Sequence, residues 1–172
     1  MKRLVLLLTT ALFLVSAAPL SASAQSDGGG TFKIGPRLTL DLGDISDAYD
    51  GTVALGGDAR YKPSSFPVGG SAAFDFYFAG DNFTVYTLDF NALYPIETEA
   101  AFSPYVGAGI GYTNVSIDTD TQLGSFGGSD TGINLVGGAE FEVGSLQPFA
   151  QAQITLGNLT RFGITGGLLF SL

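Results

Sequence analysis

The sequence contains no cysteine, no histidine and no tryptophan. Without cysteine the chain can form no disulfide bond and offers no thiolate ligand for zinc. Without histidine it lacks the side chain that most often serves as a general base and as a transition-metal ligand. These absences weigh against disulfide scaffolds, cysteine-ligated zinc sites and histidine-dependent catalysis.

Charge is scarce and one-sided. Only 13% of the 172 residues are charged, and 16 Asp and Glu outnumber seven Lys and Arg. The hydrophobic fraction of 45% is too high for an intrinsically disordered chain. A nucleic-acid partner would select basic clusters, so the acidic balance argues against one. The length fits a single domain, but a domain this apolar and this acidic is unusual among soluble proteins.

The first 24 residues have the three parts of a secretory signal peptide. Two basic residues come first, an apolar stretch extends to about Ala18, and small residues precede Gln25. The apolar stretch is shorter than the roughly 20 residues that a membrane-spanning helix needs. We therefore expect export, cleavage between Ala24 and Gln25, and a flexible lead-in over residues 25–31.

From Phe32 onward apolar and polar residues alternate, which is the pattern of β-strands. Clusters of Gly, Pro, Ser, Asn or Asp separate the alternating runs, as turns require. The runs are longer than the roughly 5–6 residues usual in globular strands and match the roughly 9–11 residues of a tilted membrane-spanning strand. The predicted strands are 32–42, 52–62, 68–78, 84–94, 103–112, 132–143, 148–156 and 161–172.

The two faces of these strands differ in chemistry. One face is apolar and carries no charge, whereas the other carries every basic residue that follows the signal peptide. Alternation alone does not decide which face points outward, because a soluble lipocalin-like barrel would place the apolar face inside. If the polar face points inward, it predicts a lumen charge network of Arg37, Asp58, Arg60, Asp75, Asp89, Glu140 and Arg161.

Aromatic residues on the apolar face concentrate towards the strand ends. They would form two girdles, with Tyr61, Tyr94, Phe141 and Phe170 at one rim and Phe76, Phe78, Tyr86, Tyr112 and Phe162 at the other. The two interfaces of a bilayer select such girdles around an aliphatic band. Together with acidic and basic residues on one parity, they favour an all-β, eight-stranded antiparallel up-and-down transmembrane β-barrel over residues 32–172.

A spanning sheet must close on itself, because lipid offers no hydrogen-bond partners to the backbone. With an even number of strands both termini would lie in the periplasm. The surface loops would then be 43–51, 79–83, 113–131 and 157–160, and the periplasmic turns 63–67, 95–102 and 144–147. The longest of these, 113–131, would be the main surface loop.

Two segments carry a resemblance to a known family. They are Asp89-Phe90-Asn91-Ala92-Leu93-Tyr94-Pro95 and Ser103-Pro104-Tyr105-Val106-Gly107-Ala108-Gly109-Ile110-Gly111-Tyr112. This region resembles the small outer-membrane barrels of the OmpA, OmpX and OmpW kind. The final run, with Phe170 and Leu172 in step, resembles the C-terminal signal read by the barrel-assembly machinery. The resemblance implies a bacterial outer-membrane protein in contact with outer-membrane lipid.

Three functions are compatible with such a barrel. The first is a non-enzymatic barrel that presents surface loops and whose lumen is plugged by the charge network; the second is a narrow channel for ions or small solutes. The third is an enzyme, but outer-membrane enzymes of this kind commonly pair Ser with His, and a Ser without an adjacent base is a weak nucleophile. We expect a closed, non-enzymatic monomer with no cofactor and no nucleic-acid partner.

Acidic loops raise the question of a metal. Asp44, Asp47 and Asp50 recur every three residues, and oxygen-rich loops can bind Ca²⁺. The loops lack the glycine and terminal glutamate of an EF-hand loop, so solvated surface loops are the better interpretation. We predict no metal site.

Overall fold

The computed structural model describes residues 29–49, 52–79, 83–117, 126–144 and 146–172. Within these residues the chain forms eight strands and one short helix. They are β1 (Thr31–Asp41), α2 (Asp44–Tyr49), β2 (Val53–Lys62), β3 (Gly69–Tyr77), β4 (Phe83–Pro95), β5 (Phe102–Ile117), β6 (Phe126–Phe141), β7 (Leu146–Leu156) and β8 (Arg161–Ser171). No helix in these ranges is long and apolar enough to cross a membrane. The expected cleavage site at Ala24 and Gln25 lies outside the described residues.

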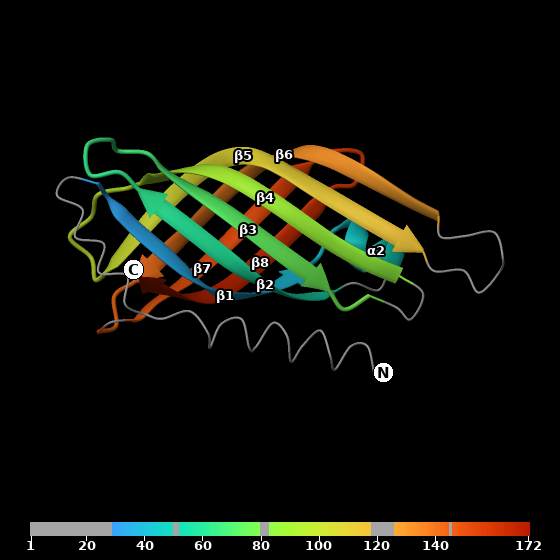
Figure 1. Cartoon of the computed structure of the whole chain (residues 1–172), viewed down its shortest axis with the longest axis horizontal. Helices are drawn as coiled ribbons and strands as arrows, with labels where there is room; N and C mark the ends of the chain where they lie inside the picture. Colours follow the sequence, from blue (N-terminus) through green and yellow to red (C-terminus); the bar gives the residue numbers. More distant parts are fainter. Residues whose placement is uncertain (1–28, 50–51, 80–82, 118–125, 145) are drawn as a thin grey trace.

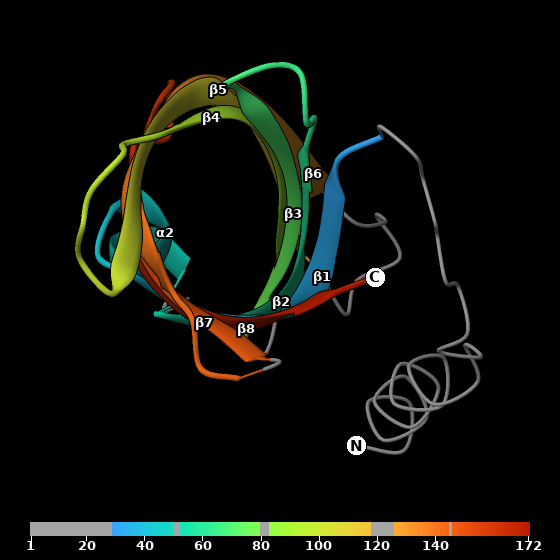
Figure 2. The same cartoon turned by 90° about the vertical axis from the view of Figure 1, so that its left-hand side faces the viewer.

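Each strand pairs antiparallel with the next one in the chain, and β1 pairs with β8 to close the sheet into a barrel (Figures 1 and 2). At the closing seam Leu40 lies opposite Ile164. Beyond it the Leu172 N–H donates a hydrogen bond to the Phe32 carbonyl, 3.0 Å away. Closure leaves no sheet edge along the seam. The predicted eight-stranded antiparallel up-and-down barrel is confirmed.

The barrel has two distinguishable ends. The start of β1 and the C-terminus lie at one end, which we call the terminal end (Figure 1). The other end, which we call the loop end, carries α2 and the connections that follow β1, β3, β5 and β7.

Side chains alternate between the lumen and the outer face along every strand, as the pleat requires. On the outer face Leu38, Leu135 and Ile164 are each about half exposed, at 48–49%. In the lumen Asp75 and Asp89 are each 1% exposed. The barrel therefore has an apolar exterior and a polar interior, which is the inverse of a soluble barrel.

Two predictions for the loop end are wrong. The segment 113–131 was expected to be a loop, but its two flanks extend β5 to Ile117 and begin β6 at Phe126. The outward positions there are polar, Asn114 and Ser116 among them, so the apolar alternation that marks a membrane strand is missing. Segment 43–51 was also expected to be a loop, but it contains α2, whose six residues are too few for a helical period to show.

Candidate functional site

All seven charged residues of the predicted network point into the lumen, and with Lys33 they form ion pairs there. At the terminal end Lys33 Nζ lies 2.6 Å from Glu140 Oε2. The other oxygen of Glu140 lies 2.8 Å from Arg60 Nη1. Arg60 Nε in turn contacts Asp58 Oδ1 at 3.0 Å. These contacts join β1, β6 and β2 across the lumen, so the charges link opposite walls.

The chain of ion pairs continues towards the middle of the barrel. Arg37 Nη1 lies 3.3 Å from Asp58 Oδ2, and Arg37 Nη2 lies 3.1 Å from Asp75 Oδ2. Thr39 Oγ1 donates a hydrogen bond to the same Asp75 oxygen and is 2.9 Å from the hydroxyl of Thr165. All five residues are buried, and each charge has a partner of opposite sign.

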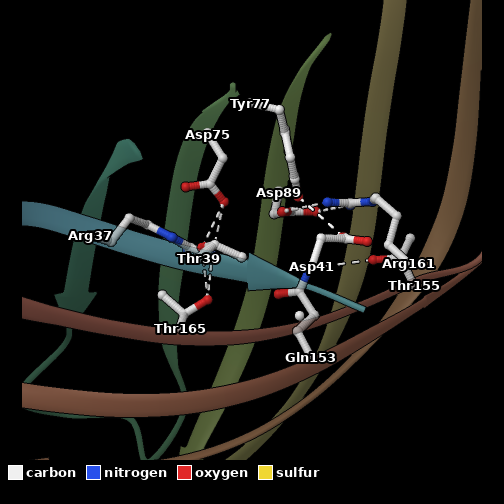
Figure 3. Close-up of a pocket in the computed structure, with 11 residues that line it drawn as sticks. Arg37, Thr39, Asp41, Asp75, Tyr77, Asp89, Gln153, Thr155, Arg161 and Thr165 are labelled. Carbon is white, nitrogen blue, oxygen red and sulfur yellow. Dashed lines mark hydrogen bonds and ion pairs between the residues drawn. The ribbon is translucent and has the colours of Figure 1, made fainter. Parts of the chain in front are cut away.

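A second ion pair lies nearer the loop end. Arg161 donates two hydrogen bonds to Asp89, at 2.6 and 3.4 Å, in a bidentate arrangement (Figure 3). Asn134 donates to both Asp89 and Asn91, and Thr155 donates to the Asn134 oxygen at 2.7 Å. The amide and hydroxyl groups thus extend the pair into a network that reaches from β4 to β7.

Aromatic side chains inside the lumen also contact the network, and they are not among the residues predicted from the sequence. The Arg60 guanidinium lies over the ring of Phe149 at 4.2 Å and over that of Tyr105 at 4.9 Å. Such cation–π contacts stabilise a desolvated guanidinium. The sequence pattern could have identified them. Both aromatics, like Tyr77, fall on the same alternating positions as the charged residues, which point inward, and not on those of the girdle residues.

Glycine makes room for these side chains. A Cβ atom added at Gly111 would lie 2.5 Å from Arg161 Nη2, 2.6 Å from Asp89 Oδ1 and 2.7 Å from Asn134 Oδ1. These distances are far below van der Waals contact, so the pair of Arg161 and Asp89 occupies the space that a side chain would need. Gly111 of β5 is therefore part of the site.

Little space remains around the ion pairs. The gap in the middle of the lumen, bordered among others by Arg37, Asp75, Asp89 and Arg161, has a volume of about 10 Å³ (Figure 3). That is close to the smallest volume that holds one water molecule. The polar side chains therefore fill the cross-section at this level.

An apolar cluster closes the lumen at the loop end. Ile45 of α2 is fully buried against Ala54, Tyr77, Val85 and Val115, which come from β2, β3, β4 and β5. The α2 segment is held in place from outside the cluster, since the Asp44 carboxylate accepts a hydrogen bond from the Thr160 N–H at 2.7 Å. We call these five buried residues the apolar cap.

The terminal end is open by comparison. A vestibule of about 560 Å³ lies there, with Lys33, Arg60 and Glu140 at its floor and apolar residues such as Leu93 and Ile96 in its walls. Its rim carries further charged residues, including Lys62 and Glu142. The lumen therefore ends in a wide mouth with charged residues on one side and in the apolar cap on the other.

The nine predicted girdle residues lie on the outer face, four near the terminal end and five near the loop end. At the loop end the rings of Tyr86 and Tyr112 are 6.4 Å apart, and Phe76 and Phe78 are also 6.4 Å apart. At the terminal end Phe102 lies 6.0 Å from Phe141. Phe102 is a girdle residue that the sequence did not reveal, because it falls in the predicted turn 95–102, whereas β5 begins there.

A polar contact on the loop end fixes the connection between β7 and β8. Asp130 lies in the part of β6 that extends beyond the closed barrel, since β6 pairs with β7 only from Ile133 onward. Its carboxylate accepts hydrogen bonds at 2.8 Å from the Leu159 N–H and from the Asn158 amide. These bonds hold the pKa of Asp130 below its ordinary value of 3.8.

In the described ranges no group of three or more His, Cys, Asp or Glu side chains is arranged to hold a metal ion.

The sequence matches the family model described as the outer membrane protein β-barrel domain over residues 8–168. No match was found among the curated proteins.

Several solved structures share the fold. The N-terminal β-barrel domain of Pseudomonas aeruginosa OprF has a TM-score of 0.64 and 17% identity, over 83% of this chain and 99% of that one. Ail of Yersinia pestis, solved in complex with the heparin analogue sucrose octasulfate, has a TM-score of 0.60 and 14% identity, over 84% and 99%. Neisserial surface protein A has a TM-score of 0.57 and 14% identity, over 83% and 96%. At these identities the likeness shows the fold alone.

Proposed function

The chain belongs to the outer membrane protein β-barrel family, and from this premise we propose that it acts as a closed, non-enzymatic barrel that presents its loop end at the cell surface. The family places the barrel in the bacterial outer membrane. Barrels of this membrane have short turns on the periplasmic side and longer loops outside. The terminal end then faces the periplasm, and the loop end, with α2 and the long β5–β6 hairpin, faces outward.

The filled lumen is the observation that carries this proposal. An ion crossing it would have to pass the apolar cap, break the pair of Arg161 and Asp89, and pass a gap of about 10 Å³. Each broken pair leaves a buried charge without a partner, which costs several kcal/mol. Eight strands also give an interior only wide enough for side chains to fill.

Recording of single-channel currents in planar bilayers tests the closed state. We expect no reproducible steps from the wild-type barrel. Steps whose size changes in Arg37→Ala, but not in the matched control Asp47→Ala on the exposed part of α2, would contradict the proposal. That result would support the alternative of a narrow channel through the charge network.

The residue composition supports a role without catalysis. The chain has no His, so a serine in it lacks its usual activating base, and it has no Cys that could serve as a nucleophile instead. Incubation of the purified barrel with phospholipid or lipid A tests this point. We expect both lipids to stay intact, and hydrolysis above a heat-denatured control would overturn the proposal.

The charge of the outward end narrows the choice of partners. The connections at the loop end contain several Asp but no Lys or Arg, and Asp44, Asp47 and Asp130 lie on the described part of that end. Ail was solved with a polyanionic heparin analogue. An acidic surface repels such ligands, so we expect this barrel not to bind immobilised heparin at low salt. Retention that falls as salt rises would contradict this expectation.

Export and assembly complete the proposal. We propose that the signal peptide is removed between Ala24 and Gln25 and that Phe170 and Leu172 are read by the barrel-assembly machinery. The mature protein should begin at Gln25 when its N-terminus is sequenced from outer membranes. Phe170→Ala should slow assembly into vesicles that contain the machinery, whereas the outward Phe162→Ala should not; equal rates would contradict the role of Phe170.

A further inference from the structure

The outer face of the barrel is hollowed at one place. An apolar hollow of about 280 Å³ lies over β1 to β4, bordered by Ile34, Gly57, Ala59, Ala72, Phe74 and Phe90. Asp58 and Ala73 also border it, although their side chains are buried in the lumen. The backbone of the sheet must therefore form the floor of the hollow.

Small residues on neighbouring strands create this hollow. Gly57 of β2 lies opposite Phe74 of β3, and Ala59 lies opposite Ala72. A Cβ atom added at Gly57 would meet only the Gly35 carbonyl oxygen, at 3.9 Å, so the space above it is open. Phe74 and Phe90 are 44% and 51% exposed and form walls beside the small residues.

The hollow lies within the hydrocarbon belt and not at an interface. Tyr61, in the girdle of the terminal end, is two residues from Ala59, or roughly 7 Å along the strand. Phe76, in the opposite girdle, is two residues beyond Phe74. Water does not reach this level of a bilayer, so only apolar atoms can fill the hollow.

We propose that the hollow is a binding site for one acyl chain of a membrane phospholipid. It is continuous with the lipid-facing surface, and a flexible acyl chain can lie along a channel of small residues between two aromatic walls. An unfilled hollow would leave its lining atoms without contacts on one side, so a seated chain gains dispersion contacts with Phe74 and Phe90. This inference rests on the outer-membrane location and not on the closed lumen.

Native mass spectrometry tests the site. The full barrel is released from vesicles of phosphatidylethanolamine and phosphatidylglycerol, and the phospholipids retained per barrel are counted. Gly57→Leu fills the hollow from its floor. Gly137→Leu on β6 is the matched control, because it is the same change at an outward glycine with nothing within 4 Å of its Cβ. Ala72→Leu serves as a second filling variant should Gly57→Leu not fold.

We expect the wild type and Gly137→Leu to retain one phospholipid, and Gly57→Leu or Ala72→Leu to retain at least tenfold less. Equal retention by the filled variants, or no lipid on the wild type, would overturn the proposal. A wild-type dimer that Gly57→Leu converts to monomer would also overturn it, in favour of a second copy of the chain. Because these variants leave the lumen intact, their bilayer currents test the closed state separately.

Discussion

The lumen and the outer face are built from the same eight strands but respond to different constraints. An added Cβ atom at the inward Gly111 would lie 2.5 Å from Arg161 Nη2, whereas at the outward Gly137 nothing lies within 4 Å. In the lumen the charged side chains are positioned by named partners across the barrel. On the outer face lipid supplies the contacts, so a side chain there must be apolar but its shape is little constrained, except in the hollow over β1 to β4. The lumen therefore determines stability and closure, and the outer face determines location.

Breaking one ion pair in the lumen should cause the largest loss of stability. Arg161→Met leaves the buried Asp89 without its cation, and we expect a loss of roughly 3–5 kcal/mol in the free energy of unfolding. Urea unfolding of barrels refolded into vesicles measures this loss. Lys62→Met at the exposed rim is the control, since Lys62 is in no ion pair among the described residues and should cost less than about 1 kcal/mol. Equal losses would contradict the distinction between the two regions.

A charge introduced on the outer face should cause the second-largest loss of stability, because it would have to enter the lipid. Leu135 lies midway along the lipid-facing part of β6, and we expect Leu135→Lys to cost roughly 2–4 kcal/mol in vesicles. Ser129→Lys, in the part of β6 beyond the closed barrel, should leave the free energy of unfolding unchanged. If both changes cost the same, the outer face near Leu135 does not lie in lipid.

Adding one methyl group at a glycine should destabilise the barrel on the lumen side but not on the outer face. Gly111→Ala forces a methyl group against Arg161 and Asp89, and we expect a loss of roughly 1–3 kcal/mol. Gly137→Ala makes the same chemical change on the outer face and should alter stability by less than about 0.5 kcal/mol. The same urea titration compares them, and a harmless Gly111→Ala would show that the lumen is loosely packed.

The smallest predicted effect is the titration of Asp130, which lies beyond the closed barrel and belongs neither to the lumen nor to the lipid-facing surface. Because its hydrogen bonds lower the pKa of Asp130, they contribute stability that is present above pH 3.8 and is lost as the pH falls through the lowered pKa. The amide chemical shift of Leu159 should therefore titrate with a midpoint below 3.8. Asp130→Asn should abolish this titration, and a midpoint at or above 3.8 would contradict the contact.

The sequence predicts the barrel well because lipid imposes a simple rule on each strand. Where a strand crosses the membrane, as at Leu38 and Leu40, its outward residues must be apolar and alternate with the lumen side. Beyond the membrane that rule ends, so the strand extension at Asn114 and Ser116 gives no signal. The helix α2 could not be predicted for another reason. It is shorter than two helical turns, so its sequence shows no helical period.

The contents of the lumen are only partly readable from sequence. Parity identifies Arg60 and Glu140 as inward residues, but their ion pair joins positions 80 residues apart. Which acid meets which base depends on the register and the width of the barrel, and alternation fixes neither. Ile45 in the apolar cap could not be found either, because it belongs to a loop segment whose position only the folded barrel defines.

A double-mutant cycle on Arg161 and Asp89 tests the central claim, that the lumen charges are mutual partners in one packed core, most directly. The free energies of unfolding of Arg161→Met, Asp89→Leu and the double variant are measured in the same vesicles. Partners that contact each other at 2.6 Å should couple, and we predict that the double variant costs roughly 2–3 kcal/mol less than the sum of the single variants. Additivity within about 0.5 kcal/mol would contradict the paired core.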